Sequence, residues 1–276
     1  DVFIEKKITA SGLSANGPAS AEVLIRRLSL DLIGLPPDPE RVSRFIEEYS
    51  RAPAATWKLL IEELLASESF GERWASAWLD LARYADTKGY EQDGMRNIWP
   101  WRDWVIQAFD RDLPFDQFTI LQLAGDLIDT PNESSRLATA FHRNTMTNDE
   151  GGTQNEEFRV AAVVDRVNTT MLVWQGLTAG CAQCHDHKYD PLSQVEYYQL
   201  YDFFNQSEDA DLNSEAPLLK VLGNAEKLLL GDAHQQVEKA QEVLDQAARA
   251  LVISDPEAAP AEAGALEEIA FSGKMP

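Results

Sequence analysis

The chain has only two cysteines, Cys181 and Cys184, and two residues separate them. Cysteines this close cannot form the long-range disulfides that hold together small folds without a core. The 276-residue chain must therefore bury a hydrophobic core, and its 44% of hydrophobic residues, seven Trp among them, are enough to build one. The close pair indicates a site with chemistry of its own, since it is of little use as a structural cross-link.

Apolar residues recur at helical spacing through most of the chain, which predicts a mostly helical fold. Asp38 before Pro39 is a typical helix start, because Asp caps a helix and Pro fits its first turn. Trp74, Trp78 and Leu81 are expected to share one face of their helix. No series of short alternating segments predicts a sheet. The predicted helices cover residues 1–11, 20–32, 39–49, 54–66, 69–85, 101–109, 115–123, 134–143, 156–177 and 193–205.

The composition changes after about residue 206, where aromatic residues become few and acidic residues outnumber basic ones. We expect a helical domain over residues 1–217. Residues 218–254 have Leu, Val and Ala at helical spacing and predict an amphipathic helix or half of a coiled-coil hairpin. Residues 255–276 have the Ala, Pro, Glu and Gly composition of a linker to a further domain.

The chain is strongly acidic, with 24 Lys and Arg against 46 Asp and Glu and a net charge of -22. This charge argues against nucleic acid or an anionic membrane surface as a partner. No apolar run reaches the length needed to span a bilayer. The first residue is Asp1, so we expect a processed piece from which an export signal could have been removed.

The two cysteines belong to the segment Cys181-Ala182-Gln183-Cys184-His185, which has the C-x-x-C-H pattern of c-type haem attachment. Each thiol would add to one vinyl group of the haem, and His185 would bind the iron as the proximal ligand. Three alternatives remain open. They are a thiol redox pair, two unmodified core cysteines, and a zinc site in which His185 or His187 joins the cysteines.

A second, distal iron ligand would have to come from elsewhere in the chain. His142 is the main candidate because it follows a predicted helix and precedes a glycine turn, where a side chain can be aimed. Met146 is the alternative, and an open position is the third possibility. A histidine hydrogen-bonded in the core would explain His142 equally well. A second histidine would lower the iron potential and a methionine would raise it.

Three arginines flank the expected site in this acidic protein, namely Arg143, Arg159 and Arg166. Arg159 and Arg166 are seven residues apart on one predicted helix, so they lie near the same face. Arginine pairs well with carboxylates, which makes a clamp on the haem propionates a reasonable prediction. The alternative is a set of structural ion pairs with Glu156, Glu157 or Asp165.

Two loops are rich in carboxylates and could bind calcium, although neither has EF-hand spacing and a solvated acidic loop is the alternative. A catalytic pocket would need side chains of these loops to converge on the haem. The first loop contains Asp86, Tyr90, Glu91 and Asp93, and the second contains Asp149, Glu150, Glu156 and Glu157. The side chains expected to converge are Asp86, Tyr90, His142, Arg143 and Glu150.

Longer stretches of the chain also follow a known pattern. The sequence resembles the planctomycete cytochrome c-like domain family, the second of two such domains in large secreted proteins. The resemblance covers roughly residues 1–217 and implies export, one covalent haem c and a place in a multi-domain protein, but no activity. Its most specific stretches are Phe141-His142-Arg143-Asn144-Thr145, Asn148-Asp149-Glu150-Gly151-Gly152-Thr153, Asp165-Arg166-Val167-Asn168-Thr169-Thr170 and Gly180-Cys181-Ala182-Gln183-Cys184-His185-Asp186-His187.

We therefore expect a multi-helical domain around a covalently bound haem, followed by an amphipathic helical tail, that acts in extracytoplasmic redox chemistry. The leading hypothesis is electron transfer to or from a redox partner protein or adjacent domains of the same protein. One alternative is a haem-dependent oxidoreductase with an acidic pocket beside the haem. The other is a scaffold or binding module in which haem or zinc only stabilises the fold.

Overall fold

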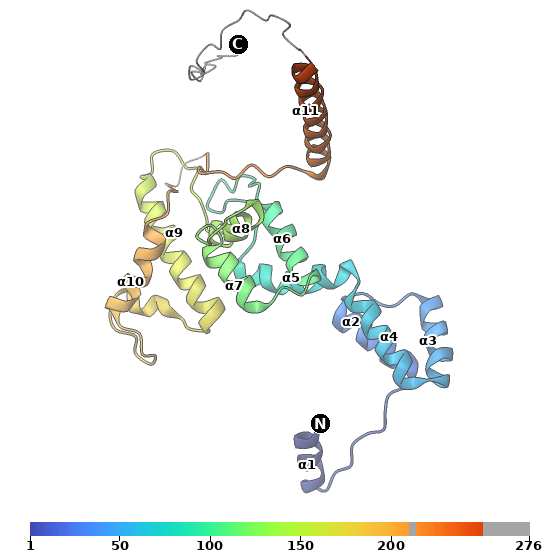
Figure 1. The fold of residues 1–276 in the computed structure, drawn as a ribbon. Coiled ribbons are helices and arrows are strands. Elements are labelled where there is room, and N and C mark those ends of the chain that lie inside the picture. The colour runs from blue at the N-terminus through green and yellow to red at the C-terminus, as the bar shows by residue number, and fades with distance from the viewer. Residues whose placement is uncertain (210–213, 251–276) are drawn as a thin grey trace, which may run out of the picture. The chain divides into compact units, whose positions relative to one another are not determined.

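A computed structural model describes residues 1–209 and 214–250 and shows helices joined by loops (Figure 1). The mostly helical prediction is confirmed. No strand forms among the described residues, where an isolated bridge joins Thr87 to Met95. The chain divides into two compact units, Asp1–Val221 and Leu222–Pro276, and we describe each by itself. The predicted linker, residues 255–276, lies outside the described residues, and the predicted domain boundaries stay predictions.

The first unit begins with an exposed helix and then a small three-helix group. The core of this group contains Ile25, Phe45, Leu60 and Leu64. Its middle helix begins as predicted, because the Asp38 carboxylate accepts a hydrogen bond from the backbone N–H of Glu40 (2.8 Å). The four helices are α1 (Val2–Ala10), α2 (Ala21–Leu32), α3 (Pro39–Arg51) and α4 (Pro53–Leu65).

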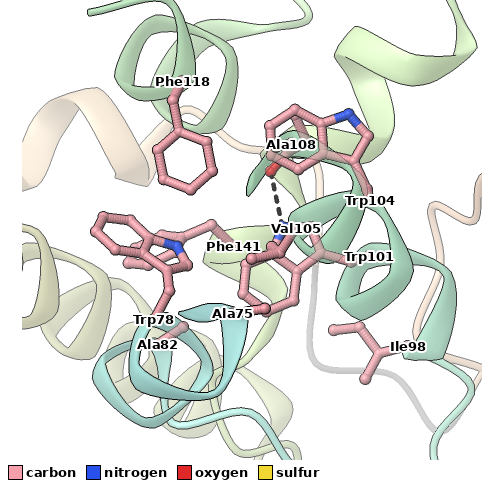
Figure 2. Close-up of a cluster of buried hydrophobic side chains, with 11 residues drawn as sticks. Ala75, Trp78, Ala82, Ile98, Trp101, Trp104, Val105, Ala108, Phe118 and Phe141 are labelled. Atoms are coloured by element: carbon pink, nitrogen blue, oxygen red, sulfur yellow. Dashed lines mark hydrogen bonds between the residues drawn. The ribbon is translucent and has the colours of Figure 1, made fainter. Parts of the chain in front are cut away.

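The largest core lies between α5 (Glu68–Ala82) and α6 (Trp99–Asp110), and α7 (Phe115–Ala124) and α8 (Glu133–Ala138) cover it (Figure 2). Large aromatic side chains fill this core, and the Trp101 indole N–H donates to the Ala138 carbonyl across it (3.1 Å). A buried aromatic side chain with a satisfied polar atom contributes much to such a core.

The structure shows which face of α5 is buried and where the helix ends. Trp78 is buried, but Trp74 and Leu81 are largely exposed, because the buried face consists of Gly71, Ala75, Trp78 and Ala82. The three small residues of this face, Gly71, Ala75 and Ala82, let α6 approach closely. A Cβ atom on Gly71 would lie 2.6 Å from the backbone oxygen of Ile106 in α6. The predicted helix over 69–85 also ends early, since Arg83 adopts a left-handed conformation (φ 59°).

The end of the first unit consists of α9 (Asn155–Thr170) and α10 (Gln194–Asn205), which lie side by side (Figure 1). The helix predicted over 156–177 stops at Thr170, and a π-helical turn follows before Gly176 ends it at φ 66°. The helix predicted over 134–143 divides in the same way, into α8 and a 3₁₀ turn, Thr139–Arg143.

The second unit contains α11 (Asn224–Ala250), a helix of 27 residues. Its described side chains are exposed to solvent. This helix agrees with the amphipathic helix predicted for this region. None of the helices in the described part of the chain is both long and apolar enough to cross a membrane.

Candidate functional site

The two cysteines lie on a short 3₁₀ turn, Ala179–Gln183, and on the residue that ends it. Ala179 and Ala182 point into a core that they share with Val167 of α9 and Tyr197 of α10. Cys181 and Cys184 are exposed and free of any disulfide. Because a 3₁₀ helix has three residues per turn, residues three apart lie on the same side. The turn therefore buries its two alanines and presents both thiols to solvent together.

His185 follows directly and is also exposed. Its Nδ1 atom lies 2.7 Å from the carbonyl oxygen of Asp186. A carbonyl can only accept a hydrogen bond, so Nδ1 carries a proton, and in the neutral ring the lone pair lies on Nε2. Histidines that bind metals commonly donate their other N–H to such a carbonyl. The imidazole is thus in the tautomer that a metal ligand needs.

The first turn of α10 holds the cysteine segment from the other side. The backbone N–H of Gln194 donates to the Asp186 carboxylate (2.8 Å). The Gln194 side chain and the Tyr198 hydroxyl both donate to the carbonyl of Gln183, each at 3.1 Å. The helix begins at a capping box between Ser193 and Glu196, which fixes its first turn. Hydrogen bonds from α10 therefore fix Gln183 and Asp186, the residues on either side of Cys184 and His185.

His187 serves the same loop instead of offering a metal ligand. Its Nδ1 atom accepts hydrogen bonds from the backbone N–H groups of Tyr189 (3.3 Å) and Asp190 (2.9 Å). Across the described residues, no three His, Cys, Asp or Glu side chains converge as a metal site would require. This arrangement gives no support to the zinc alternative, which needs four converging ligands.

His142 is half-buried, and its ring contacts the rings of Phe141 and Phe204 at centroid distances of 5.2 and 4.7 Å. Both ring nitrogens are buried without a hydrogen-bond partner. Burial, with a smaller contribution from the charge of Arg166, lowers the pKa of His142 to about 3. The imidazole is therefore neutral at physiological pH.

The structure does not bring His142 to the cysteine turn. His142 contacts the last turn of α10, whereas the turn contacts the first. No hydrogen bond, ion pair or ring contact among the described residues joins His142 to His185. Met146, the alternative ligand, is exposed and lies against Gly89. The identity of a distal ligand stays a prediction.

The three predicted arginines do come together, near the C-terminal end of α10. Arg166 pairs with Asp209, Arg143 lies 3.6 Å from the same carboxylate, and Arg159 donates to Asn205 (3.0 Å). Asn205 and Gln194 are the two ends of α10, about 16 Å apart along the axis at 1.5 Å per residue. The arginine cluster and the cysteine turn therefore occupy opposite ends of one helix.

The ion pairs of this region differ in part from those considered from the sequence. Arg159 does pair with Glu156 (2.8 Å), whereas Asp165 pairs with Arg83. Glu157 forms no ion pair among the described residues. The propionate clamp is untested, but Arg159 and Arg166 already have carboxylate partners within the chain.

Two further residues, Arg96 and Glu215, belong to this cluster of arginines and carboxylates, and sequence spacing could not predict them. Arg96 donates to Glu215, 119 residues away, and also to the carbonyls of Arg143 and Thr145. With Asp209, these side chains enclose a cavity of about 10 Å³, room for one water molecule. No local pattern marks a contact between residues so far apart in the chain.

The charges of the cluster shift the pKa values of its members. Burial alone would raise the pKa of Asp209, but the hydrogen bonds and charge of Arg166 lower it well below its ordinary range. Burial lowers the pKa of Arg143, although the charge of Asp209 opposes this. Asp209 is therefore an anion at physiological pH that balances the buried guanidinium group of Arg166 and the half-buried one of Arg143.

The two acidic loops use their carboxylates within the protein. Asp149 pairs with Lys88 (2.9 Å), and the Asp93 carboxylate accepts from the backbone N–H of Gly89 (2.8 Å). The residues expected to converge as a pocket have separate partners: the Tyr90 ring packs on Phe158, and Asp86 accepts from the Tyr84 hydroxyl. The Gln92 amide donates to Glu150 (3.4 Å). These contacts give no support to a calcium site or to a single acidic pocket.

The cysteine turn has the donor set that covalent haem attachment needs. It offers two free, exposed thiols on one side of a turn and a neighbouring imidazole whose Nε2 is free. These residues thus fit the group.

A family model matches residues 1–209, which include this turn and both long helices beside it. That family is PSCyt2, described as a protein of unknown function (DUF1549). The chain belongs to the PSCyt2 family. The family name is consistent with the resemblance to planctomycete cytochrome-like domains, although the description assigns no activity. Comparisons with curated proteins and with solved structures gave no match.

Proposed function

We propose that this PSCyt2 chain carries one haem c on Cys181 and Cys184, with His185 as its proximal ligand, and transfers electrons outside the cytoplasm. One observation carries the proposal. Both thiols project from the same side of a 3₁₀ turn, next to an imidazole held in the tautomer that leaves Nε2 free. A bound haem would supply an iron that accepts and releases one electron.

The residues of the chain would attach and orient that group. The sulfurs of Cys181 and Cys184 form the thioether bonds, so the haem is retained without a deep pocket. The Asp186 carbonyl orients the His185 ring through Nδ1. The first turn of α10 holds the backbone on both sides of Cys184 and His185. This bracing would keep the geometry of the ligand constant between oxidation states.

The exposure of the site favours electron transfer over catalysis in a pocket. Cys181, Cys184 and His185 are all exposed, so a partner could approach the attached group directly. The acidic side chains that an enzyme pocket would need have partners elsewhere in the first unit. The partner would be another redox protein or a neighbouring domain of the same protein. The location outside the cytoplasm rests on the family resemblance alone.

The decisive experiment is to produce the whole chain with a periplasmic c-type haem maturation system and to measure its denatured intact mass. We expect the added mass of one haem and a c-type pyridine haemochrome band. Replacing both cysteines, C181S with C184S, should remove the added mass and the colour. Matured wild-type chain that is colourless and has two titratable thiols would contradict the proposal.

The coordination of the ferric iron separates electron transfer from catalysis. We expect a low-spin, six-coordinate spectrum by optical absorption and EPR. The variants H142L and M146L then identify the distal ligand, because only loss of the true ligand converts the spectrum to high spin. A high-spin spectrum in the wild-type chain would contradict a simple carrier and would favour the oxidoreductase alternative.

A further inference from the structure

The helix α11 has a regular apolar seam, and the seam residues that the structure describes are exposed to solvent. Within residues 229–248, the seam residues follow one another at alternating spacings of three and four. This is the spacing of a coiled coil. Large side chains occupy every first position and alanine every second. The seam consists of Leu230, Ala233, Val237, Ala240, Leu244 and Ala247, and all six are exposed.

We propose that this seam packs against the α11 helix of a second copy of the chain, in antiparallel orientation. In that orientation Leu230 lies opposite Ala247, Leu244 opposite Ala233, and Val237 opposite Ala240. Each layer then pairs one large side chain with one small one, which allows close and even packing. The same three pairings occur twice because the arrangement is symmetric.

A parallel pair would pack poorly. Equivalent positions face each other in a parallel coiled coil, so Leu would meet Leu and Ala would meet Ala. The three alanine layers would each leave a void between the helices, and voids of this kind destabilise cores. The alternation of large and small residues therefore selects the antiparallel arrangement.

The positions beside the seam do not oppose this contact. Within residues 229–248 they are Leu229, His234, Gln236, Gln241, Val243 and Ala248, and none is Asp, Glu, Lys or Arg. Leu229 and Val243 are exposed and would add apolar area at the edge of the interface. Flanking charges usually determine which helix pairs with which. Their absence leaves the shape of the seam to select the partner, and a second α11 has the complementary shape.

The area that such a pair would bury is that of a weak dimer. At 25 cal/mol per Å², burying one Leu or Val side chain corresponds to roughly 60–120 Å². Leu230, Val237, Val243 and Leu244 from both copies would thus bury about 500–1,000 Å², and the alanines add to it. Specific interfaces start at about 1,000–1,200 Å² in total. We expect a weak, reversible dimer.

The outer face of the helix adds a dependence on salt. Within residues 229–248 it carries the acidic residues Asp232, Glu238, Glu242 and Asp245 against a single base, Lys239. Two such helices repel each other, and salt screens exposed charges over about 8–10 Å at moderate ionic strength. The dimer should therefore tighten as the salt concentration rises.

The test is sedimentation equilibrium of the whole chain from about 1 to 300 μM, a wide range over which a weak dimer should dissociate on dilution. We expect a monomer–dimer equilibrium that L244D removes. A240L discriminates the orientations: in the antiparallel pair it places Leu against Val237 and should weaken the dimer about tenfold or more. In a parallel pair it would fill a void and strengthen the dimer.

The matched control is Q235L, the same kind of change on the outer face, which should leave the equilibrium unchanged. Circular dichroism of each variant shows whether the helix content is kept, so that loss of α11 is not mistaken for loss of contact. A wild-type chain that is monomeric throughout would overturn the proposal, as would a dimer that L244D does not affect. A tighter A240L dimer would overturn the antiparallel arrangement. Because the seam is remote from the cysteines in sequence, the haem-free C181S/C184S chain should dimerise equally well.

Discussion

His185 Nδ1 lies 2.7 Å from the carbonyl oxygen of Asp186, the next residue in the chain. The carboxylate of Asp186 also accepts a hydrogen bond from the backbone N–H of Gln194, the first residue of α10 (2.8 Å). The backbone carbonyl of Asp186 thus orients the His185 ring, and the Asp186 side chain binds the first residue of α10. The orientation of His185 therefore depends on the position of α10.

Replacing Asp186 tests this link. In D186A the N–H of Gln194 loses its acceptor, and we expect the free energy of unfolding to fall by about 0.5–1.5 kcal/mol, the usual contribution of one hydrogen bond. D186N keeps an oxygen at the same place and should lose less. Urea unfolding followed by circular dichroism measures both. Equal losses in the two variants would show that the hydrogen bond to Gln194 is not the cause.

The buried ion pair between Arg166 and Asp209 should be far more important than the exposed pair between Arg83 and Asp165. The Arg166 side chain is 4% exposed and that of Arg83 is 44% exposed. R166M leaves Asp209 buried with only Arg143 nearby, which should cost about 3–5 kcal/mol of stability. R83M should cost about 1 kcal/mol or less. Chemical unfolding at pH 7 compares them, and similar losses would contradict the difference in burial.

The burial of His142 should make stability depend on pH. Its pKa falls from 6.5 in the unfolded chain to about 3 in the folded one, so the unfolded chain binds a proton first. This contribution to stability is complete above pH 6.5 and is lost as the pH falls toward 3. Between pH 7 and 5 the loss should be about 2 kcal/mol.

The measurement for His142 is urea unfolding at both pH values in the haem-free C181S/C184S chain, where no iron can engage the ring. H142L should remove this part of the pH dependence and leave the rest. H234Q, at an exposed histidine of α11, serves as the control and should behave as the parent does. An unchanged pH dependence in H142L would show that the ring is not buried as a neutral group.

Two tryptophans on the same helix should differ in their contribution to the core. Trp78 is 9% exposed and packs against Phe118, whereas Trp74 is 41% exposed. W78A should lower the free energy of unfolding by about 3–5 kcal/mol. W74A should lower it by about 1 kcal/mol or less, as is usual at surfaces. Thermal unfolding of both variants measures the two losses, and an equal loss would contradict the difference in burial between Trp74 and Trp78.

These tryptophans illustrate which parts of the fold the sequence could predict. Helical spacing and caps locate most helices, and Asp38 before Pro39 marks the start of α3 correctly. Spacing alone cannot tell which side of a helix is buried, because that depends on its neighbour. The close approach of α6 to Gly71 turned the buried face of α5 away from Trp74 and Leu81. The helix ends at Arg83 and Gly176 likewise depend on left-handed backbone conformations.

The candidate site was predictable only where its residues are neighbours in sequence. The C-x-x-C-H pattern identified Cys181, Cys184 and His185 because attachment needs them a few residues apart. The contacts that orient them come from Gln194 and Tyr198, and no local pattern pointed to these residues. Arg143, Arg159 and Arg166 were expected beside the cysteines as a propionate clamp, which stays a prediction, and the partners Asp209 and Glu215 lie at long sequence separation.

The hydrogen bonds from Arg96 and Arg143 to Glu215 determine where the first unit can be cut for study in isolation. The Glu215 carboxylate accepts from Arg96 (2.6 Å), and its backbone carbonyl accepts from Arg143 (2.5 Å). A fragment trimmed at residue 209, where the family match stops, would lack Glu215 and leave Arg96 with neutral acceptors, while Arg143 would keep only Asp209 as a partner. A fragment that runs to Val221 keeps Glu215, and protease digestion of the intact chain should spare the peptide bonds beside this residue.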